Sequence, residues 1–292
     1  MICPCCDGSL QQAAGTGMES ATKYQDSVYF ATADGDGLYV NLFSSSTLDW
    51  AEKGVSITQT TNFPVEQGTT LTVTGKATFD LHLRVPAWAQ DGFEVTINDR
   101  VLTRKFTPGT YTTISRVWRT GDTVRISMPF RLRVERALDD PAKQTLFYGP
   151  INLVARDART TYLPIGLYRN AGLSGDLAGT LTPVENAPLR FTLDGVEIAP
   201  FLEGTEDPTH VYFQRVEPRV VFGNVDSGVA NPAKGDGTTL LDEIWAAAPF
   251  RTRYQLIDQV KLTKEEWEAA GLLSAADAKK VVNTARKASY LP

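Results

Sequence analysis

The residues best suited to chemistry in this 292-residue chain are its three cysteines, which lie together near the N-terminus. They are Cys3, Cys5 and Cys6, in the run Met1-Ile2-Cys3-Pro4-Cys5-Cys6. Cysteine thiolates bind soft metals, act as nucleophiles and form disulfides. An odd number of closely spaced cysteines is not typical of a secreted disulfide framework. A metal site or a reactive thiol is therefore the better interpretation of this cluster.

The two histidines and Trp88 are weaker candidates. His82 lies on the polar face of a predicted strand and has no cysteine or histidine near it in sequence, so we expect it to face solvent. His210, in the run Thr209–Phe213, could contact a sugar, but a strand residue of a β-sandwich is the more ordinary interpretation. Trp88 could stack on a sugar ring, or it could anchor its loop to the sandwich. With only two histidines, no Ser-His-Asp arrangement can be argued.

Two acidic segments also have an ordinary interpretation. Glu19 could face a sugar pocket, but we favour a local cap or ion pair. The run Asp34-Gly35-Asp36-Gly37 has some features of a calcium loop, yet it lacks the later ligands and the closing glutamate. Asp-Gly sequences are typical of tight hairpin turns, and we predict one here.

The composition is that of a globular protein, with 42% hydrophobic residues, 22% charged residues and a net charge of −5. This mild acidity argues against nucleic acid or an anionic membrane as the main partner. No apolar run reaches the roughly 18 residues that a membrane-spanning helix needs. No signal segment precedes the cysteines. The compartment is therefore unknown, with the cytoplasm as the default expectation.

The hydrophobic pattern predicts short strands from residue 27 to about residue 224. In the segment Phe79–Val85, apolar and polar residues alternate, as expected for a strand with one buried and one solvated face. We expect antiparallel pairing up to about residue 135, with separate strands at 71–73 and 79–85. Further strands are expected at 28–31, 38–42, 55–60, 93–97, 111–117, 123–128, 144–148, 151–155, 190–193, 196–198 and 210–215.

The C-terminal part changes to a helical pattern. One short helix is expected over 238–247, before Pro249. The run Thr263-Lys264-Glu265-Glu266 fits a capping box, with Leu262 stapled against Trp267, and predicts a helix start. Ser274 predicts the start of a final helix that runs towards Ser289.

The fold class is therefore mainly β, with β-sandwich (jelly-roll-like) domains and a short helical C-terminal segment. We predict four parts. Residues 1–26 are the end of a preceding domain, 27–135 a middle β-sandwich, 136–224 a C-terminal β domain, and 225–292 a helical extension.

Several motifs, in order along the chain, resemble one family of glycoside hydrolases. The family comprises the DUF1680 proteins, or glycoside hydrolase family 127, which includes β-L-arabinofuranosidases. The resemblance covers about residues 1–223 and is carried by the Cys-x-Cys-Cys cluster, Gly15-Thr16-Gly17-Met18-Glu19-Ser20, Lys23–Phe30, Asp36–Phe43, Arg84-Val85-Pro86-Ala87-Trp88 and Leu146-Phe147-Tyr148-Gly149-Pro150.

The resemblance implies that this chain corresponds to the part of the family that follows its catalytic (α/α)6 barrel. It thus implies a fragment of a retaining glycoside hydrolase, or a start assigned too far downstream. Relative to one branch of the family, Ser9–Ala14 looks like an insertion, or like a divergent or misassigned start. Ala21 stands where that branch often has a histidine. We expect little or no activity from the chain alone.

The resemblance also assigns roles to the cysteines. In the family, the first cysteine of the vicinal pair is a zinc ligand and the nucleophile, and the second is a ligand. Carried over, Cys5 is the catalytic residue, and Cys5 and Cys6 are the metal ligands; no catalytic role is assigned to Cys3. Zinc favours the thiolate, whose attack on the anomeric carbon gives a covalent glycosyl-enzyme and net retention. The remaining zinc ligands and the acid/base glutamate come from the barrel, so zinc is expected only if these are supplied.

Three hypotheses follow for the function of the chain and its partner. The chain is the β part of a β-L-arabinofuranosidase-like enzyme, with carbohydrate as substrate. Alternatively, it is a non-catalytic β-sandwich module that binds carbohydrate or packs on a partner, and the cysteines are a thiol cluster without a site. In the third hypothesis it complements a separately encoded N-terminal barrel.

Overall fold

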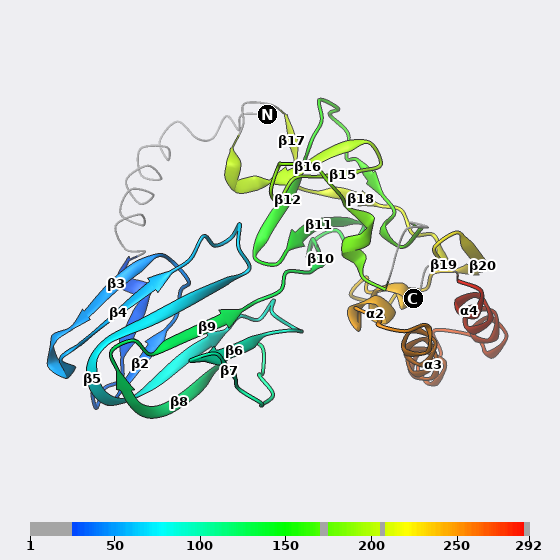
Figure 1. Cartoon of the computed structure of the whole chain (residues 1–292). Coiled ribbons are helices and arrows are strands. Elements are labelled where there is room, and N and C mark those ends of the chain that lie inside the picture. The colour runs from blue at the N-terminus through cyan, green and yellow to red at the C-terminus, as the bar shows by residue number, and fades with distance from the viewer. Residues whose placement is uncertain (1–24, 170–174, 205–207, 289–292) are drawn as a thin grey trace. The chain divides into compact units, whose positions relative to one another are not determined.

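The computed structural model describes residues 25–169, 175–204 and 208–288 (Figure 1). It divides into two compact units, one up to Pro129 and the other from Phe130 onward. The described residues are mainly β, with α-helices in the C-terminal part, as predicted. Both units carry a nine-stranded sheet, and the second also has a separate two-stranded hairpin.

The first unit is a sheet that curls into two layers, and the long strand β5 takes part in both of them. Its first half pairs with β4 and β9, and its second half pairs with β2 and β8. The strands are β1 (Tyr29–Ala31), β2 (Gly37–Val40), β3 (Ser46–Trp50), β4 (Val55–Thr60), β5 (Gly68–Val85), β6 (Glu94–Ile97), β7 (Arg100–Val101), β8 (Thr110–Arg119) and β9 (Thr123–Ser127).

The expectation of two separate strands at 71–73 and 79–85 is wrong, because both lie in β5. Gly75, between them, has a φ of +103°, and its backbone N–H donates to the Thr120 hydroxyl at 2.8 Å. Glycine adopts this conformation without steric cost, so the strand changes direction there without losing its pairing. The alternation is confirmed, since Phe79, Leu81, Leu83 and Val85 are buried in the core.

One strand pair departs from the predicted antiparallel arrangement. β2 lies parallel to the second half of β5, with Tyr39 beside His82. The chain between them forms β3 and β4, which pair with each other, and β4 pairs in turn with the first half of β5. A parallel pair requires such a crossover connection. Tyr39 and His82, far apart in sequence, are therefore neighbours on one sheet.

The second unit contains a larger number of short strands. They are β10 (Leu132–Arg136), β11 (Lys143–Tyr148), β12 (Ile151–Arg156), β13 (Pro164–Ile165), β14 (Thr182–Pro183), β15 (Phe191–Leu193), β16 (Val196–Pro200), β17 (Thr209–His210) and β18 (Phe213–Arg215), followed by the hairpin of β19 (Arg219–Phe222) and β20 (Val225–Ala230). Short 3-10 helices in the two units span Gln25–Ser27, Ala51–Lys53, Leu167–Arg169, Leu177–Thr180 and Phe201–Glu203.

Three α-helices follow the hairpin: α2 (Leu240–Ala246), α3 (Arg253–Ala269) and α4 (Ala275–Lys287). α4 lies beside α3 and the β19–β20 hairpin (Figure 1). The Thr239 and Ser274 hydroxyls accept backbone N–H groups at the starts of α2 and α4, as the sequence predicts for the final helix. All three helices belong to the same compact unit as β10–β20. The four-part domain division stays a prediction.

The predicted helix start at Thr263 is wrong. The cap of α3 lies eleven residues earlier, at Thr252, whose hydroxyl accepts the backbone N–H of Gln255 at 3.3 Å. Thr263 is buried inside the helix, and its hydroxyl accepts from the Gln259 side chain. Glutamate is a good helix former throughout a helix, so a Thr-x-x-Glu run also occurs in helix interiors.

Candidate functional site

The predicted catalytic and metal-binding residues, Cys5 and Cys6, lie outside the described residues, as do Cys3 and Glu19. Their assignment stays a prediction. Within residues 25–169, 175–204 and 208–288, no group of three or more His, Cys, Asp or Glu side chains is placed to hold a metal ion. In the same ranges, no helix has the length and apolar character needed to cross a membrane.

The segment Asp34–Gly37 is a hairpin turn between β1 and β2, as predicted. The Thr32 hydroxyl donates to Asp34 Oδ1 at 2.5 Å and accepts the Gly37 N–H at 2.8 Å. Asp36 forms an ion pair with Lys53 at 2.9 Å. These short-range contacts occupy the carboxylates and account for the turn without a cation.

A row of side chains crosses the outer face of the first unit, on the side opposite its core. Phe30 of β1 lies beside Tyr39 of β2, Tyr39 beside His82 of β5, and His82 beside Thr113 of β8. The rings of Tyr39 and His82 stack with centroids 4.3 Å apart, and His82 Nδ1 is 2.8 Å from the Thr113 hydroxyl. The sequence predicts that His82 faces solvent. In the structure it is instead half-buried, in a ring stack with Tyr39.

Polar and aromatic groups surround this row. The Tyr111 ring meets Tyr39 edge-on at 5.0 Å, and the Tyr111 hydroxyl donates to Asn41 Oδ1 at 2.6 Å. A shallow hollow of about 250 Å³ adjoins Thr113, and Arg104 in its lining donates to the Thr113 carbonyl at 2.9 Å. This arrangement is not predictable from the sequence. The period-2 pattern places each residue on the outer face, but it does not give the register between strands.

Trp88 and His210, the other two residues singled out in the sequence, both have ordinary structural roles. Trp88 is half-buried against the core of the first unit, and its ring stacks on Phe63 with a centroid distance of 6.4 Å. This packing supports the loop-anchor interpretation. His210 lies on β17 beside Ala155, with Nε2 3.2 Å from the Asp157 carbonyl oxygen. It is a strand residue, as expected.

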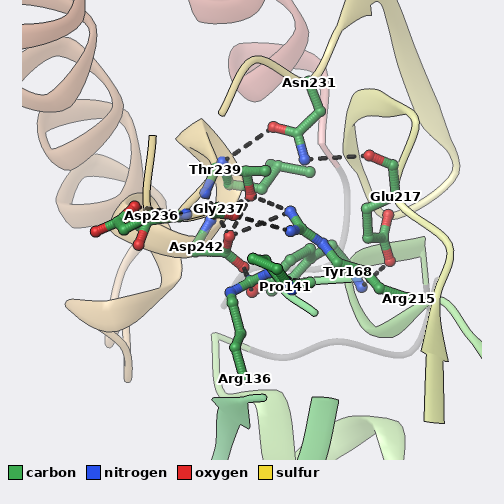
Figure 2. Close-up of polar contacts among 12 residues, drawn as sticks. Arg136, Pro141, Tyr168, Arg215, Glu217, Asn231, Asp236, Gly237, Thr239 and Asp242 are labelled. Atoms are coloured by element: carbon green, nitrogen blue, oxygen red, sulfur yellow. Dashed lines mark hydrogen bonds and ion pairs between the residues drawn. The ribbon is translucent and has the colours of Figure 1, made fainter. Parts of the chain in front are cut away.

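The second unit contains a buried polar cluster around Asp242, in the first turn of α2 (Figure 2). The Asp242 carboxylate accepts the Tyr168 hydroxyl at 2.7 Å and the Thr239 N–H at 2.6 Å. It also pairs with Arg136 and, at 3.2 Å, with Arg215. Burial and the neighbouring Asp242 carboxylate hold the pKa of Tyr168 well above its usual value, so Tyr168 remains a donor. The cluster thus fastens α2 to strands β10 and β18.

Glu217 lies next to this cluster and differs from it chemically (Figure 2). Its side chain is 2% exposed; Oε1 accepts the Tyr168 N–H at 3.1 Å. Oε2 has no hydrogen-bond partner in the described part of the chain, and the nearest cation is Arg169, whose Nε is 3.9 Å from it. Burial raises the pKa of Glu217 to about 7. A carboxyl group of this kind exchanges its proton near neutral pH.

A surface hollow of about 350 Å³ adjoins the Glu217 segment. It is lined by Pro164, Gly166, Arg169, Leu193, Asp194 and Val216. A methyl group added at Gly166 would approach Glu217 Oε1 to 3.2 Å, so Glu217 lies directly behind the glycine backbone. The hollow offers one cation and one carboxylate at its lining, without the clustered carboxylates that a metal or glycosidase centre needs.

Comparison with known proteins gives the outer-face row its context. Residues 37–130 match the family model described as "Beta-L-arabinofuranosidase, GH127 middle domain". The matched segment lies almost wholly within the first unit. The resemblance predicted from the ordered motifs is thus confirmed for this segment. The matched segment contains Tyr39, His82, Tyr111 and Thr113, so most of the row lies within it.

One solved structure shows a similar fold, and two others show a weaker likeness. One, described as a glycoside hydrolase, has a TM-score of 0.53 at 17% identity and covers 74% of this chain and 40% of its own. A GH127 β-L-arabinofuranosidase from Geobacillus stearothermophilus T6 has a TM-score of 0.48 at 23% identity. Its alignment covers 68% of this chain and 36% of that protein. A further GH127 β-arabinofuranosidase has a TM-score of 0.46 at 20% identity. Its alignment covers 65% of this chain and 36% of that protein. The chain therefore spans 40% or less of these proteins. No curated protein sequence matches it.

Proposed function

We propose that this chain supplies the β-sandwich part of a retaining glycoside hydrolase that acts on β-L-arabinofuranosides or related sugars. The observation that carries the proposal is the GH127 middle domain over residues 37–130. We further propose that the 292-residue chain alone has little or no activity. One fact supports this: the chain aligns with only 40% of the solved glycoside hydrolase.

Within this proposal, Cys5 and Cys6 contribute thiolates to a zinc site, and Cys5 is the nucleophile. Bound zinc would lower the thiol pKa and keep the thiolate available at neutral pH. Catalytic zinc sites normally have three protein ligands and one open position. The other ligands and the acid/base carboxylate would come from an (α/α)6 barrel, whether linked to this part or separately encoded.

An activity measurement tests the proposal. We expect the purified chain to leave p-nitrophenyl β-L-arabinofuranoside intact, and we expect hydrolysis when a GH127 barrel is fused or added. In that combined protein, Cys5→Ser should reduce kcat by about 1,000-fold or more, because a covalent nucleophile is lost. Cys3→Ser is the matched control and should retain activity. Hydrolysis by the chain alone, or equal activity of the Cys5 and Cys3 variants, would contradict the proposal.

A second candidate function is that the first unit binds carbohydrate without cleaving it. The specific observation in its favour is the outer-face row, where Tyr111 is 42% exposed and Phe30 is 47% exposed on a sheet that also presents polar side chains. Aromatic residues with a polar end are enriched at binding surfaces. This function does not require the cysteines, and it can be tested on the chain alone.

A further inference from the structure

We propose that the outer face of β1, β2, β5 and β8 binds a short neutral oligosaccharide, with the stacked Tyr39 and His82 rings as its platform. The proposal rests on the carbohydrate-binding candidate above and names its site. The row from Phe30 to Thr113 crosses three strand spacings, about 14 Å. This length accommodates a short chain of sugar residues lying across the strands.

The aromatic groups of the row provide the apolar part of the site. Tyr39 and His82 stack at an interplanar angle of 20°, and Tyr111 meets Tyr39 at 88°. Sugar rings have apolar C–H faces, and aromatic rings offer large apolar surfaces of suitable shape. Phe30 and Tyr111, at the edges of the row, are about half exposed. The sheet thus holds aromatic surface toward solvent that a core would normally bury.

The rings are held in place before any ligand arrives. His82 Nδ1 is bonded to Thr113, and the Tyr111 hydroxyl is bonded to Asn41. Gly37 leaves room for the imidazole, because a methyl group there would lie 2.7 Å from His82 Nε2. Side chains that are already ordered lose little rotamer freedom on binding. The row is therefore suited to a weakly binding, polar ligand.

The polar groups around the rings indicate a neutral ligand. Among the described residues, His82 Nε2 has no hydrogen-bond partner. It can therefore form a hydrogen bond with a sugar hydroxyl. Arg104 and Thr113 line the adjoining hollow. Charges of both signs flank the row, since Asp80 and Arg84 precede and follow His82 on the same face of β5. A mixture of signs favours neither an anionic nor a cationic ligand.

Calorimetric titration of the full 292-residue chain tests the proposal. The probes are arabinotriose, xylotriose and cellotriose, each to about 10 mM, a range that detects millimolar dissociation constants. We expect at least one to bind. Tyr39→Ala and His82→Gln should each weaken that binding by about tenfold or more, equivalent to at least 1.4 kcal/mol. Tyr111→Phe, which loses the bond to Asn41, should weaken it less.

Val117→Ala provides the matched control. Val117 lies on β8, on the same outer face as Thr113 and four residues further along, and is 43% exposed. Its truncation should leave binding unchanged. Thermal unfolding shows whether each variant is folded. If Tyr39→Ala does not fold, the imidazole proton signals of His82 in the unmodified chain decide the matter, because they should shift on addition of the binding sugar.

Each other outcome has a defined meaning. If none of the three sugars binds, both the carbohydrate-binding function and this site are overturned. If a sugar binds equally well to folded Tyr39→Ala, or leaves the His82 signals unmoved, the function stands and the site is overturned. If Val117→Ala weakens binding as much as Tyr39→Ala, the site is overturned as well, since the ring platform is then not the determinant.

Discussion

Glu217 is a carboxyl group that the fold keeps out of water, with its nearest cation, Arg169, 3.9 Å away. Its pKa is raised to about 7 from an ordinary value of 4.5, chiefly by burial. The folded chain therefore holds this proton up to about pH 7, whereas the unfolded chain releases it near pH 4.5. Because the folded state binds more protons in this window, stability must fall as the pH rises from 4.5 to 7. Above pH 7 the loss is complete, about 3 kcal/mol at most.

Glu217→Gln removes this proton linkage and keeps the acceptor for the Tyr168 N–H. We expect the variant to be more stable than the unmodified chain at pH 8, by about 1–3 kcal/mol, and to differ much less at pH 5. Urea unfolding at the two pH values measures this difference. Glu185→Gln, at an exposed position, is the control and should show no such change. An equal effect of Glu217→Gln at both pH values would contradict the linkage.

At the scale of elements, β5 depends on Gly75 for its passage between the two layers. A Cβ at this position would lie 2.4 Å from the Gly54 carbonyl oxygen, and φ is +103°. We expect Gly75→Ala to destabilise the chain by about 3 kcal/mol or more, from backbone strain and the clash together. Gly121→Ala is the control, because Gly121 has a φ of +89° but no atom within 4 Å of the added group. It should cost only about 1 kcal/mol. Thermal or urea unfolding ranks the two variants, and equal costs would rule out the clash.

The start of α2 gives a second prediction at this scale. Thr239 caps the helix, and its hydroxyl also accepts a bond from Arg215 at 2.5 Å. Thr252 caps α3 from an exposed position. Thr239→Ala should therefore lower the free energy of unfolding by about 2–3 kcal/mol, because it removes both the cap and a buried hydrogen bond. Thr252→Ala, which removes only a cap, should lower it by about 1 kcal/mol. Urea unfolding of both variants measures the difference. A smaller cost at Thr239 would show that the polar cluster does not depend on the cap.

At the scale of the whole molecule, local patterns predicted more than long-range pairing did. The alternation in Phe79–Val85 gave its buried face correctly, and Ser274 gave the start of α4. The continuity of β5 and the parallel β2–β5 pair were missed, because register and crossovers are properties of the assembled sheet. The Thr263 motif failed since helix interiors tolerate the same residues as helix starts.

The candidate sites show the same limit. The ordered motifs predicted the resemblance to GH127 proteins, which the middle-domain match over residues 37–130 confirms. The roles of Cys5 and Cys6 remain predictions, since these residues lie outside the described ranges. His82 was recognised as an outer-face residue, but its stacking on Tyr39 was not predictable. The two residues are 43 positions apart, and only the crossover through β3 and β4 makes them neighbours.

The parallel β2–β5 pair also has a kinetic consequence. Sheets dominated by contacts between distant parts of the sequence fold more slowly than those built from hairpins. Phe30, Tyr39, His82 and Thr113 come from four strands, and the ring stack exists only after β5 has been made and β2 has docked along it. The appearance of Tyr39–His82 contact during refolding would therefore mark the moment at which the first unit closes. A nascent chain ending before residue 82 could present the tyrosine but not the platform.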